Sequence, residues 1–273
     1  MNRSRDIVIE GTERAAGIIL GKIVGKSVDA DAVVIATGGT FLLRQRRFHG
    51  DGYRFAKEAG HTVTPLSPAL VPFVCAEDDV KELQGLSLRN IEVTVWNGKK
   101  VLWKEFGEML FTHFGVSGPL ILSASSFYSK NLSKRKGGDE VKLFLDLKPA
   151  LTPEQLDKRL LRDFEEAKNK QFKNALDHLF PAKLIPVMIE LSDISPEKKV
   201  NEISREERKA FGSLIKELPM TVAGTRSFAE AIITQGGNLG KRISILPPME
   251  SKTCTASVFR RGSIGSGCHD RGL

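Results

Sequence analysis

The stretch DADAVVIATGG, residues 29–39, joins a short apolar run to a glycine-rich end. Residues 32–36 are consecutive apolar residues rich in Val and Ile, without the alternation of a half-exposed strand. Such a run is typical of a strand covered on both faces, as in a parallel sheet. Thr37, Gly38 and Gly39 then end the strand on nearly bare backbone. Because ligands of open α/β sheets bind beyond the carboxyl ends of strands, we expect a large flat or phosphate-bearing ligand to contact this main chain.

Composition and charge set broad limits on the class of protein. The chain has 273 residues, of which 41% are hydrophobic and 27% charged, so it is long enough for one large domain or two modest ones. Lys and Arg number 41 against 33 Asp and Glu, which gives a net charge of +8. This excess is compatible with a polyanion or an anionic cofactor. The charge is spread, however, with NLSKRKGGDEVK (131–142) as the dense cluster, which favours a solvated basic surface.

The sequence offers no sign of a membrane segment, a secretion signal or a cysteine framework. No apolar run approaches the ~20 residues of a membrane helix, and the start MNRSRDIVIEG lacks the apolar core of a signal peptide. We therefore expect a cytoplasmic protein. Cys75, Cys254 and Cys268 form no paired CxxC spacing, so we interpret them as reduced thiols and expect no metal site.

Residues 5–150 are dominated by strand patterns. Residues 5–35 read as short strands in a small antiparallel ribbon that leads to the buried strand. YRFAKEA (53–59) predicts a short amphipathic helix that Gly60 ends. Alternating apolar and polar residues between Leu88 and Leu147 then predict several strands of a second, antiparallel β unit.

Residues 151–218 change to a helical pattern. Thr152 and Gln155 have the spacing of a capping box, with proline at the first helical position, and Ser204 and Glu207 repeat the box. Residues 174–191 lie between them and predict one or two further helices. Strand-like residues 219–225 and 229–237 then return the chain to the β unit. Because the helical insert has its own capping signals, we expect it to be separable from the β unit.

Several apparent motifs do not fit the chemistry they suggest. GKIVGKS (21–27) encloses three residues between its glycines where a phosphate loop needs four, and GSIGSG (262–267) lacks the strand and helix of a dinucleotide fingerprint. Ser117 lacks the Gly-x-Ser-x-Gly elbow of a hydrolase. His113 is a candidate general acid or base or a merely positioned histidine. Gly115 and Gly118 mark either a tight hairpin or a loop against a planar ligand.

The order of the sequence motifs resembles the bacterial flavoproteins grouped as HI0933-like, an NAD(P)/FAD-dependent, aminoacetone-oxidase-like family. The resemblance runs from about residue 5 to Lys252 and rests on DADAVVIATGG, GDGYRFAKEAGHTVTPLSPALVP, LQGLSLRN, GEMLFTHFGVSGPLIL, LDLKP, GTRSFAEAIITQGG and PPMESK. It implies a mixed α/β fold with two dinucleotide-binding domains, in which an FAD domain is interrupted by a β-barrel-like domain and that barrel by helices. The domains expected are 1–63 (partial FAD-binding domain), 64–150 (first part of the barrel-like domain), 151–218 (helical insert), 219–248 (return of the barrel-like domain) and 249–273 (remnant of the FAD domain with an aberrant tail).

Three segments depart from the family pattern. No Gly-x-Gly-x-x-Gly turn precedes the resemblance, although such a turn and its helix hold the FAD pyrophosphate in the family. The residues from Thr253 onward do not resemble the family, and TFLLRQRRFH (40–49) is likewise foreign. We therefore expect an N-terminally truncated chain with a frameshifted, disordered tail that binds FAD poorly.

The resemblance implies an FAD-dependent oxidoreductase that transfers electrons or hydride to a small organic substrate, with NAD(P)H as electron donor and with activity impaired in this chain. No catalytic acid or base is assigned. The resemblance places the following residues at the cofactor or substrate: Ala36, Thr37, Gly38, Gly39, Gly50, Asp51, Gly52, His113, Gly115, Ser117, Gly118, Thr225, Gly236 and Gly237. We expect no nucleic-acid or membrane partner and leave the oligomeric state open. The alternatives are a non-catalytic remnant and a basic nucleic-acid-binding module, for which two Trp and two Tyr offer few stacking rings.

Overall fold

The structure is a computed structural model that describes residues 11–15, 18–22, 33–35, 42–43, 46–47, 51–58, 60–132, 140–237 and 257–259. The chain divides into two compact units, and the larger is centred on residues 67–235. We call this larger part the barrel unit. The flanking unit is built from segments on both sides of it in the sequence. Each unit is described by itself.

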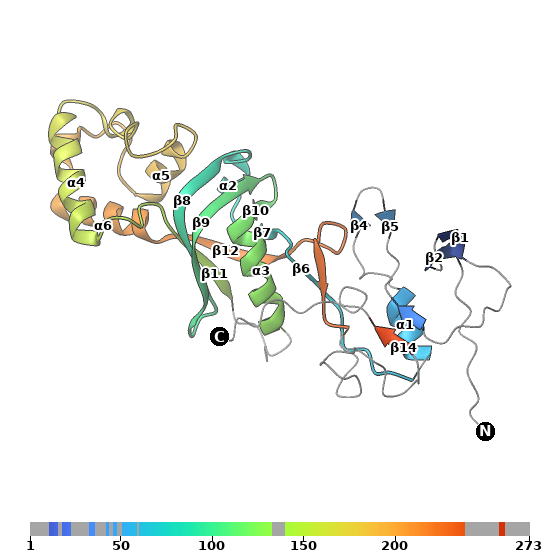
Figure 1. Ribbon diagram of the computed structural model, residues 1–273. Helices are drawn as coiled ribbons and strands as arrows, with labels where there is room; N and C mark the ends of the chain where they lie inside the picture. Colours follow the sequence, from blue (N-terminus) through green and yellow to red (C-terminus); the bar gives the residue numbers. More distant parts are fainter. Residues whose placement is uncertain are drawn as a thin grey trace, which may run out of the picture. The chain divides into compact units, whose positions relative to one another are not determined.

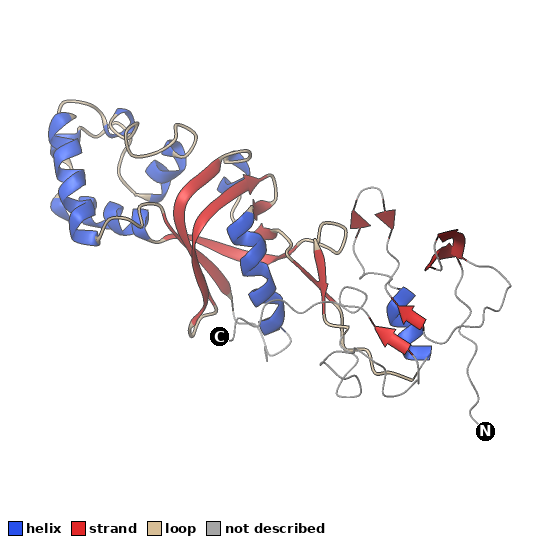
Figure 2. Ribbon diagram, viewed as in Figure 1, coloured by secondary structure: helices blue, strands red, loops and turns tan. Residues whose placement is uncertain are grey.

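The barrel unit contains a closed barrel (Figures 1 and 2). Its strands follow the order β10-β7-β12-β11-β8-β9, and all neighbouring pairs are antiparallel. The strands are β7 (Phe73–Cys75), β8 (Ser87–Trp96), β9 (Val101–Thr112), β10 (Gly115–Ser117), β11 (Val141–Asp146) and β12 (Leu218–Thr225). The barrel and the mixed α/β class predicted from the sequence are therefore confirmed.

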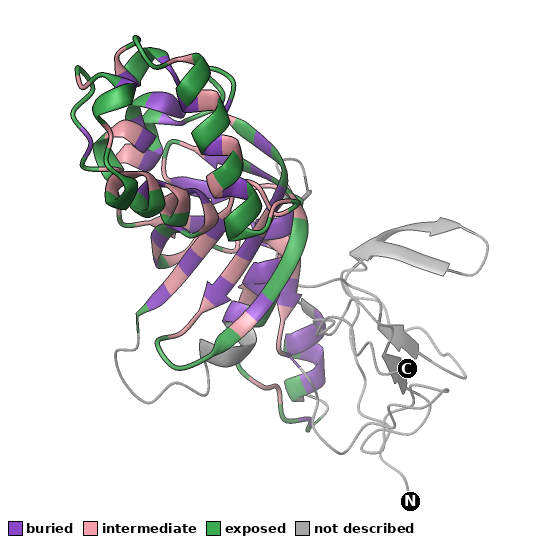
Figure 3. Ribbon diagram, turned by 90° about the vertical axis from the view of Figure 1, so that its left-hand side faces the viewer, coloured by how far each residue is buried: buried purple, intermediate pink, exposed green. Residues whose placement is uncertain are grey.

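The alternation of side chains along β8 and β11 explains why these segments form barrel strands. Val93 and Val95 of β8 are fully buried, as are Leu143 and Leu145 of β11. The residues between them are partly exposed, and Figure 3 shows this alternation of buried and intermediate positions along the strands. Because successive side chains of a strand point to opposite faces, the apolar set fills the barrel interior.

The helix α3 (Pro119–Leu132) was not predicted from the sequence, where residues 88–147 were interpreted as strands. This helix packs on β9, where a Cβ added at Gly107 would lie 3.1 Å from the side chain of Leu120. Ser125 Oγ accepts a hydrogen bond of 2.9 Å from Val71 N. The absence of a side chain at Gly107 therefore lets the helix approach the barrel closely.

A helical insert lies between β11 and β12, at one end of the barrel strands (Figure 1). It consists of α4 (Pro153–Glu166), η1 (Phe172–Asn174), α5 (Ile185–Leu191), η2 (Val200–Glu202) and α6 (Arg205–Lys216). Both predicted capping boxes are confirmed. Thr152 Oγ1 accepts from Gln155 N at 3.3 Å, and Ser204 Oγ accepts from Glu207 N at 3.1 Å.

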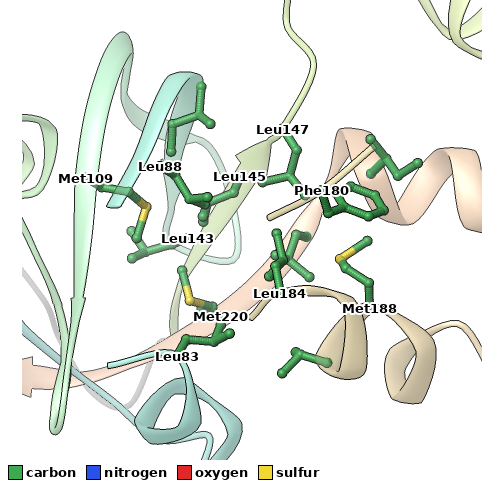
Figure 4. Packing of buried hydrophobic residues seen from close by; sticks show 14 of the residues in the cluster. Leu83, Leu88, Met109, Leu143, Leu145, Leu147, Phe180, Leu184, Met188 and Met220 are labelled. Carbon is green, nitrogen blue, oxygen red and sulfur yellow. The ribbon is translucent and has the colours of Figure 1, made fainter. Parts of the chain in front are cut away.

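The helical insert and the barrel share one hydrophobic core, which argues against the prediction that the insert is separable. Leu143, Leu145 and Met220 of the barrel belong to the same buried cluster as Leu184 and Met188 of the insert, as Figure 4 shows. Removing the helices would therefore expose part of the barrel core. The capping signals gave the starts of α4 and α6 correctly but carried no information on their packing.

The flanking unit contains short strands and one helix. The strand β3 (Val33–Ile35), predicted from the opening stretch, pairs in parallel with β14 (Ser257–Phe259). The prediction of a disordered tail was thus wrong for these three residues of β14. The strands β1 (Gly11–Ala15) and β2 (Ile18–Lys22) form an antiparallel ribbon, as predicted. The helix α1 (Asp51–Glu58) is followed by Gly60 at φ +83°, which confirms the predicted helix end.

Two further ribbons complete the described strands. In the barrel unit β6 (Ser67–Ala69) pairs antiparallel with β13 (Ile233–Gln235). The strands β4 (Leu42–Leu43) and β5 (Arg46–Arg47) pair with each other. A single turn of helix, α2 (Asp79–Glu82), lies between β7 and β8. None of the described helices is long and apolar enough to cross a membrane.

Candidate functional site

A sharply bent turn joins β9 to β10 and carries four of the predicted site residues. We call residues 112–118 the barrel turn. Thr112 Oγ1 donates a hydrogen bond of 3.0 Å to the carbonyl oxygen of Gly115. The carbonyl oxygen of Phe114 accepts from Cys75 N at 3.1 Å, which ties the turn to β7. His113 is exposed at this turn, and Ser117 is partly exposed at the end of β10.

Only glycine fits at the two bends of the barrel turn. Gly115 has φ +153°, and a Cβ there would collide with the carbonyl oxygen of Phe73 and lie 2.8 Å from Cys75 N. Gly118 has φ +94°, and its Cβ would lie 3.0 Å from Met109 Cα. These glycines therefore have a structural reason within the chain, because side chains are strongly disfavoured in this backbone region.

The strand order brings a second predicted segment next to the barrel turn. Thr225 pairs with Phe73 of β7 from one side, while Val116 pairs with Phe73 from the other. The residue after Thr225 is Arg226, and its Cζ lies 4.4 Å from the ring centroid of Phe114. The structure thus places the turn with His113 and the end of β12 with Thr225 on either side of the same strand, β7, although the two residues are far apart in the sequence.

The contacts around Phe114 involve residues that the sequence did not indicate. The imidazole of His113 packs against the ring of Phe114 with centroids 4.9 Å apart. Arg226 is fixed in turn, because its Nε and Nη2 bond Glu230 Oε1 at 2.7 and 2.6 Å and its backbone N donates to Pro72 O at 3.0 Å. Arg226 and Glu230 lie in a loop and turn rather than in a helix, so their four-residue spacing was no signal for this pair.

The thiol of Cys75, beside the barrel turn, is unreactive. Burial raises the pKa of the Cys75 thiol to about 12, and the nearby carboxylate of Glu77 adds to the effect. Because the thiolate is the reactive form, Cys75 is not a nucleophile at neutral pH. This agrees with its interpretation as a reduced thiol. Among the residues that the structure describes, no group of three His, Cys, Asp or Glu is arranged to hold a metal ion.

We expect Cys75 to resist alkylation in the folded chain. Iodoacetamide at pH 8 should leave the peptide containing Cys75 unmodified, whereas the same treatment in urea should label it fully, because unfolding restores an ordinary thiol pKa. Mass spectrometry of the digested protein measures both states. Rapid labelling of Cys75 in the folded protein would show that its thiol is accessible and ionised, against the structure.

The remaining predicted residues lie in the flanking unit or outside the described part. Gly236 and Gly237 have φ +90° and +67°, and a Cβ would collide with Pro65 O at Gly236 and with the Tyr53 ring at Gly237. Asp51 and Gly52 begin α1. Ala36, Thr37, Gly38, Gly39 and Gly50 lie outside the described residues. The assignment of all these residues to a cofactor stays a prediction.

A groove of about 440 Å³ lies where the barrel meets the helical insert. It is lined by Trp96 and Phe144, whose rings pack edge to face with centroids 6.3 Å apart. The two lysines that line it form ion pairs with carboxylates of the same groove. Lys216 Nζ contacts Asp146 Oδ2 at 2.5 Å, and Lys104 Nζ contacts Glu92 Oε1 at 2.6 Å. None of the predicted site residues lines this groove, whereas the barrel turn carries four of them, so the barrel turn remains the better candidate.

The known proteins that are similar to this chain include a reductase and two synthases. A 3-dehydro-bile acid delta(4,6)-reductase of Clostridium scindens is 28% identical over 78% of the chain and 51% of its own length. Two ribosomal RNA dihydrouridine synthases, from Haemophilus influenzae and Escherichia coli, are 29% and 28% identical over 83% and 86% of the chain and over 52% and 54% of their own lengths. The chain therefore spans about half the length of the curated relatives it matches.

A protein-family model agrees with the boundaries of the barrel unit. The model, described as the HI0933-like protein barrel and H2TH domain, matches residues 67–233, which is more than half of the chain. This range contains all strands of the closed barrel and all helices of the insert. The resemblance found in the sequence motifs is thus confirmed, and the chain belongs to the HI0933-like protein family.

Proposed function

We propose that this chain is part of a flavin-dependent oxidoreductase that reduces a carbon–carbon double bond conjugated to a carbonyl group. The observation that carries the proposal is the chemistry shared by the names of its relatives. A delta(4,6)-reductase of a 3-dehydro bile acid and a dihydrouridine synthase both denote the saturation of such a double bond. Both kinds of relative cover more than three quarters of this chain, 78% and 83%, which supports a common reaction with different substrates.

The family resemblance implies FAD as the cofactor and NAD(P)H as the electron donor. A bound flavin supplies the hydride, while the protein positions it and shapes the pocket. Of the residues that the resemblance assigns to FAD, Asp51 and Gly52 are described, at the start of α1. Other atoms of the chain lie close to four of the predicted glycines, Gly115, Gly118, Gly236 and Gly237. These glycines therefore leave no open space beside their Cα atoms for a cofactor.

We propose a small organic molecule as the substrate because of how charge is distributed. Residues 67–235 hold 25 Lys and Arg and 24 Asp and Glu, so most of the net charge of +8 comes from the rest of the chain. Binding of RNA relies strongly on Lys and Arg that neutralise phosphates, and this range has almost no net excess of them. An RNA substrate is the second candidate, which the names of two relatives favour.

The test is an anaerobic oxidation experiment on the chain with excess FAD, since we expect its affinity for FAD to be low. The flavin is photoreduced, and androst-4-ene-3,17-dione or a uridine-containing RNA oligonucleotide is added. We expect the dione to reoxidise the flavin and to gain two hydrogen atoms, measured by absorbance and mass spectrometry. The saturated 5α-androstane-3,17-dione is the matched control and should not react. Reaction of the RNA alone would establish the second candidate, and reaction of neither would contradict the proposal.

A further inference from the structure

The barrel turn holds an exposed histidine in a fixed position. The backbone on both sides of His113 is tied by the hydrogen bond from Thr112 Oγ1 to Gly115 O and by that from Cys75 N to Phe114 O. The positive φ of Gly115 fixes the bend that follows. His113 itself is solvent-exposed, so burial does not explain why its surroundings are so constrained.

Arg226 is the second group at this place, and it reaches the turn from another strand. Its guanidinium lies over the face of Phe114, the ring that also packs against His113. Glu230 Oε1 accepts from Nε and Nη2, which leaves the N–H groups of Nη1 outside this ion pair. The side chain of Arg226 is 38% exposed. The ring of Phe114 thus contacts both an imidazole and a guanidinium.

The stability that these contacts add to the fold is too small to explain why the cluster is so well ordered. Exposed cation–π contacts and surface ion pairs contribute little, while ordering long side chains costs conformational entropy. Fixed, exposed donors at a strained turn are more typical of a binding site than of a packing contact. The chemistry is that of hydrogen-bond donors, because imidazole N–H and guanidinium N–H groups both donate.

We propose that His113 and Arg226 bind the carbonyl oxygen of the substrate's α,β-unsaturated ketone. This inference rests on the proposed function and adds the residues that would recognise its substrate. Hydrogen bonds to the carbonyl oxygen withdraw electron density from the conjugated double bond and so make its β-carbon more electrophilic. Phe114 positions both donors, and Glu230 positions Arg226. The carboxylate of Glu230 also disfavours an anionic ligand, so a neutral ketone is the better match.

The test measures binding of androst-4-ene-3,17-dione to the full chain by equilibrium dialysis, without any redox step. His113→Ala and Arg226→Ala should each weaken binding about tenfold, the size expected for one lost hydrogen bond. His113→Gln keeps a side-chain N–H donor and should recover part of the affinity. His178→Ala and Arg162→Ala alter exposed residues of the helical insert and should bind as the unaltered chain does.

A second readout separates binding from folding. In NMR spectra the imidazole signals of His113 should shift when the dione is added, while those of His178 stay in place. Thermal midpoints of all variants are compared, so that a loss of folding is recognised. If the unaltered chain binds the dione but His113→Ala and Arg226→Ala bind it equally well, this inference is wrong and the proposed function stands. If the unaltered chain does not bind the dione, the proposed substrate class fails and the inference fails with it.

Discussion

Replacing residues 151–217 by a short turn is expected to abolish cooperative unfolding of the barrel. The helical insert and the barrel are built around one buried cluster, in which Leu184 is 1% exposed and Met188 is fully buried. The insert is also bonded to barrel residues, since Lys183 Nζ donates to Gln84 O and Lys216 Nζ pairs with Asp146. Deletion exposes the apolar residues of that cluster to water. Each Å² of apolar surface exposed costs roughly 25 cal/mol of folding free energy.

Urea unfolding followed by circular dichroism and Trp fluorescence measures this effect. The shortened chain should show a broad transition without a folded baseline. Leu184→Ala is the milder test and should lower the free energy of unfolding by about 2–5 kcal/mol, because it opens a cavity in the shared core. Leu161→Ala is the matched control, since Leu161 is 45% exposed, and should change stability by less than about 0.5 kcal/mol. A sharp transition in the deletion variant would restore the view that the insert is separable.

The strands of the barrel were predictable because their signal is local. In β11, and in β8 from Ile91 to Val95, every second residue is buried, so the spacing of Val, Ile and Leu predicts these strands directly. The capping boxes at Thr152 and Ser204 are local in the same sense, because their hydrogen bonds join residues three apart. Such local signals predict whether a segment forms a strand or a helix and where a capped helix begins, and the structure agrees with both.

The helix α3 was missed because its sequence is ambiguous at short range. Residues 119–122 are Pro, Leu, Ile and Leu, an apolar run that periodicity alone cannot distinguish from a buried strand. Pro119 at the first helical position was the signal for a helix. The buried Leu120, Ala124 and Tyr128 at four-residue spacing supported it, since they form the face that packs on the barrel.

The candidate site could be predicted only in part because it depends on strand order. The sequence pointed to His113 and Thr225 separately. Their proximity follows from the position of β7 between β10 and β12, a pairing of segments far apart in the chain. The stacking of Arg226 on Phe114 depends on the same order. Local patterns contain no information on such pairings, which explains why both Phe114 and Arg226 were missed.

Gly115→Ala is expected to cause a large loss of stability by breaking the closure of the barrel. The added Cβ would collide with the backbone of β7, at the carbonyl oxygen of Phe73 and within 2.8 Å of Cys75 N. Backbone atoms of a paired strand cannot move aside as a flexible side chain can, so β10 would have to leave β7. We expect the free energy of unfolding to fall by more than about 4 kcal/mol, because losses of this size are typical of substitutions that disrupt the backbone or the core.

Two other glycines of the barrel unit separate the effect of space from that of backbone conformation. Gly98 has φ +82° but no atom within 4 Å of an added Cβ, so Gly98→Ala should cost only about 1 kcal/mol. Gly224 has neither a positive φ nor a close neighbour, and Gly224→Ala should be nearly neutral. Urea unfolding of the three variants gives the comparison. If Gly115→Ala cost no more than Gly98→Ala, the close approach of β10 to β7 would be wrong, and with it the geometry that places Phe114 beside Arg226.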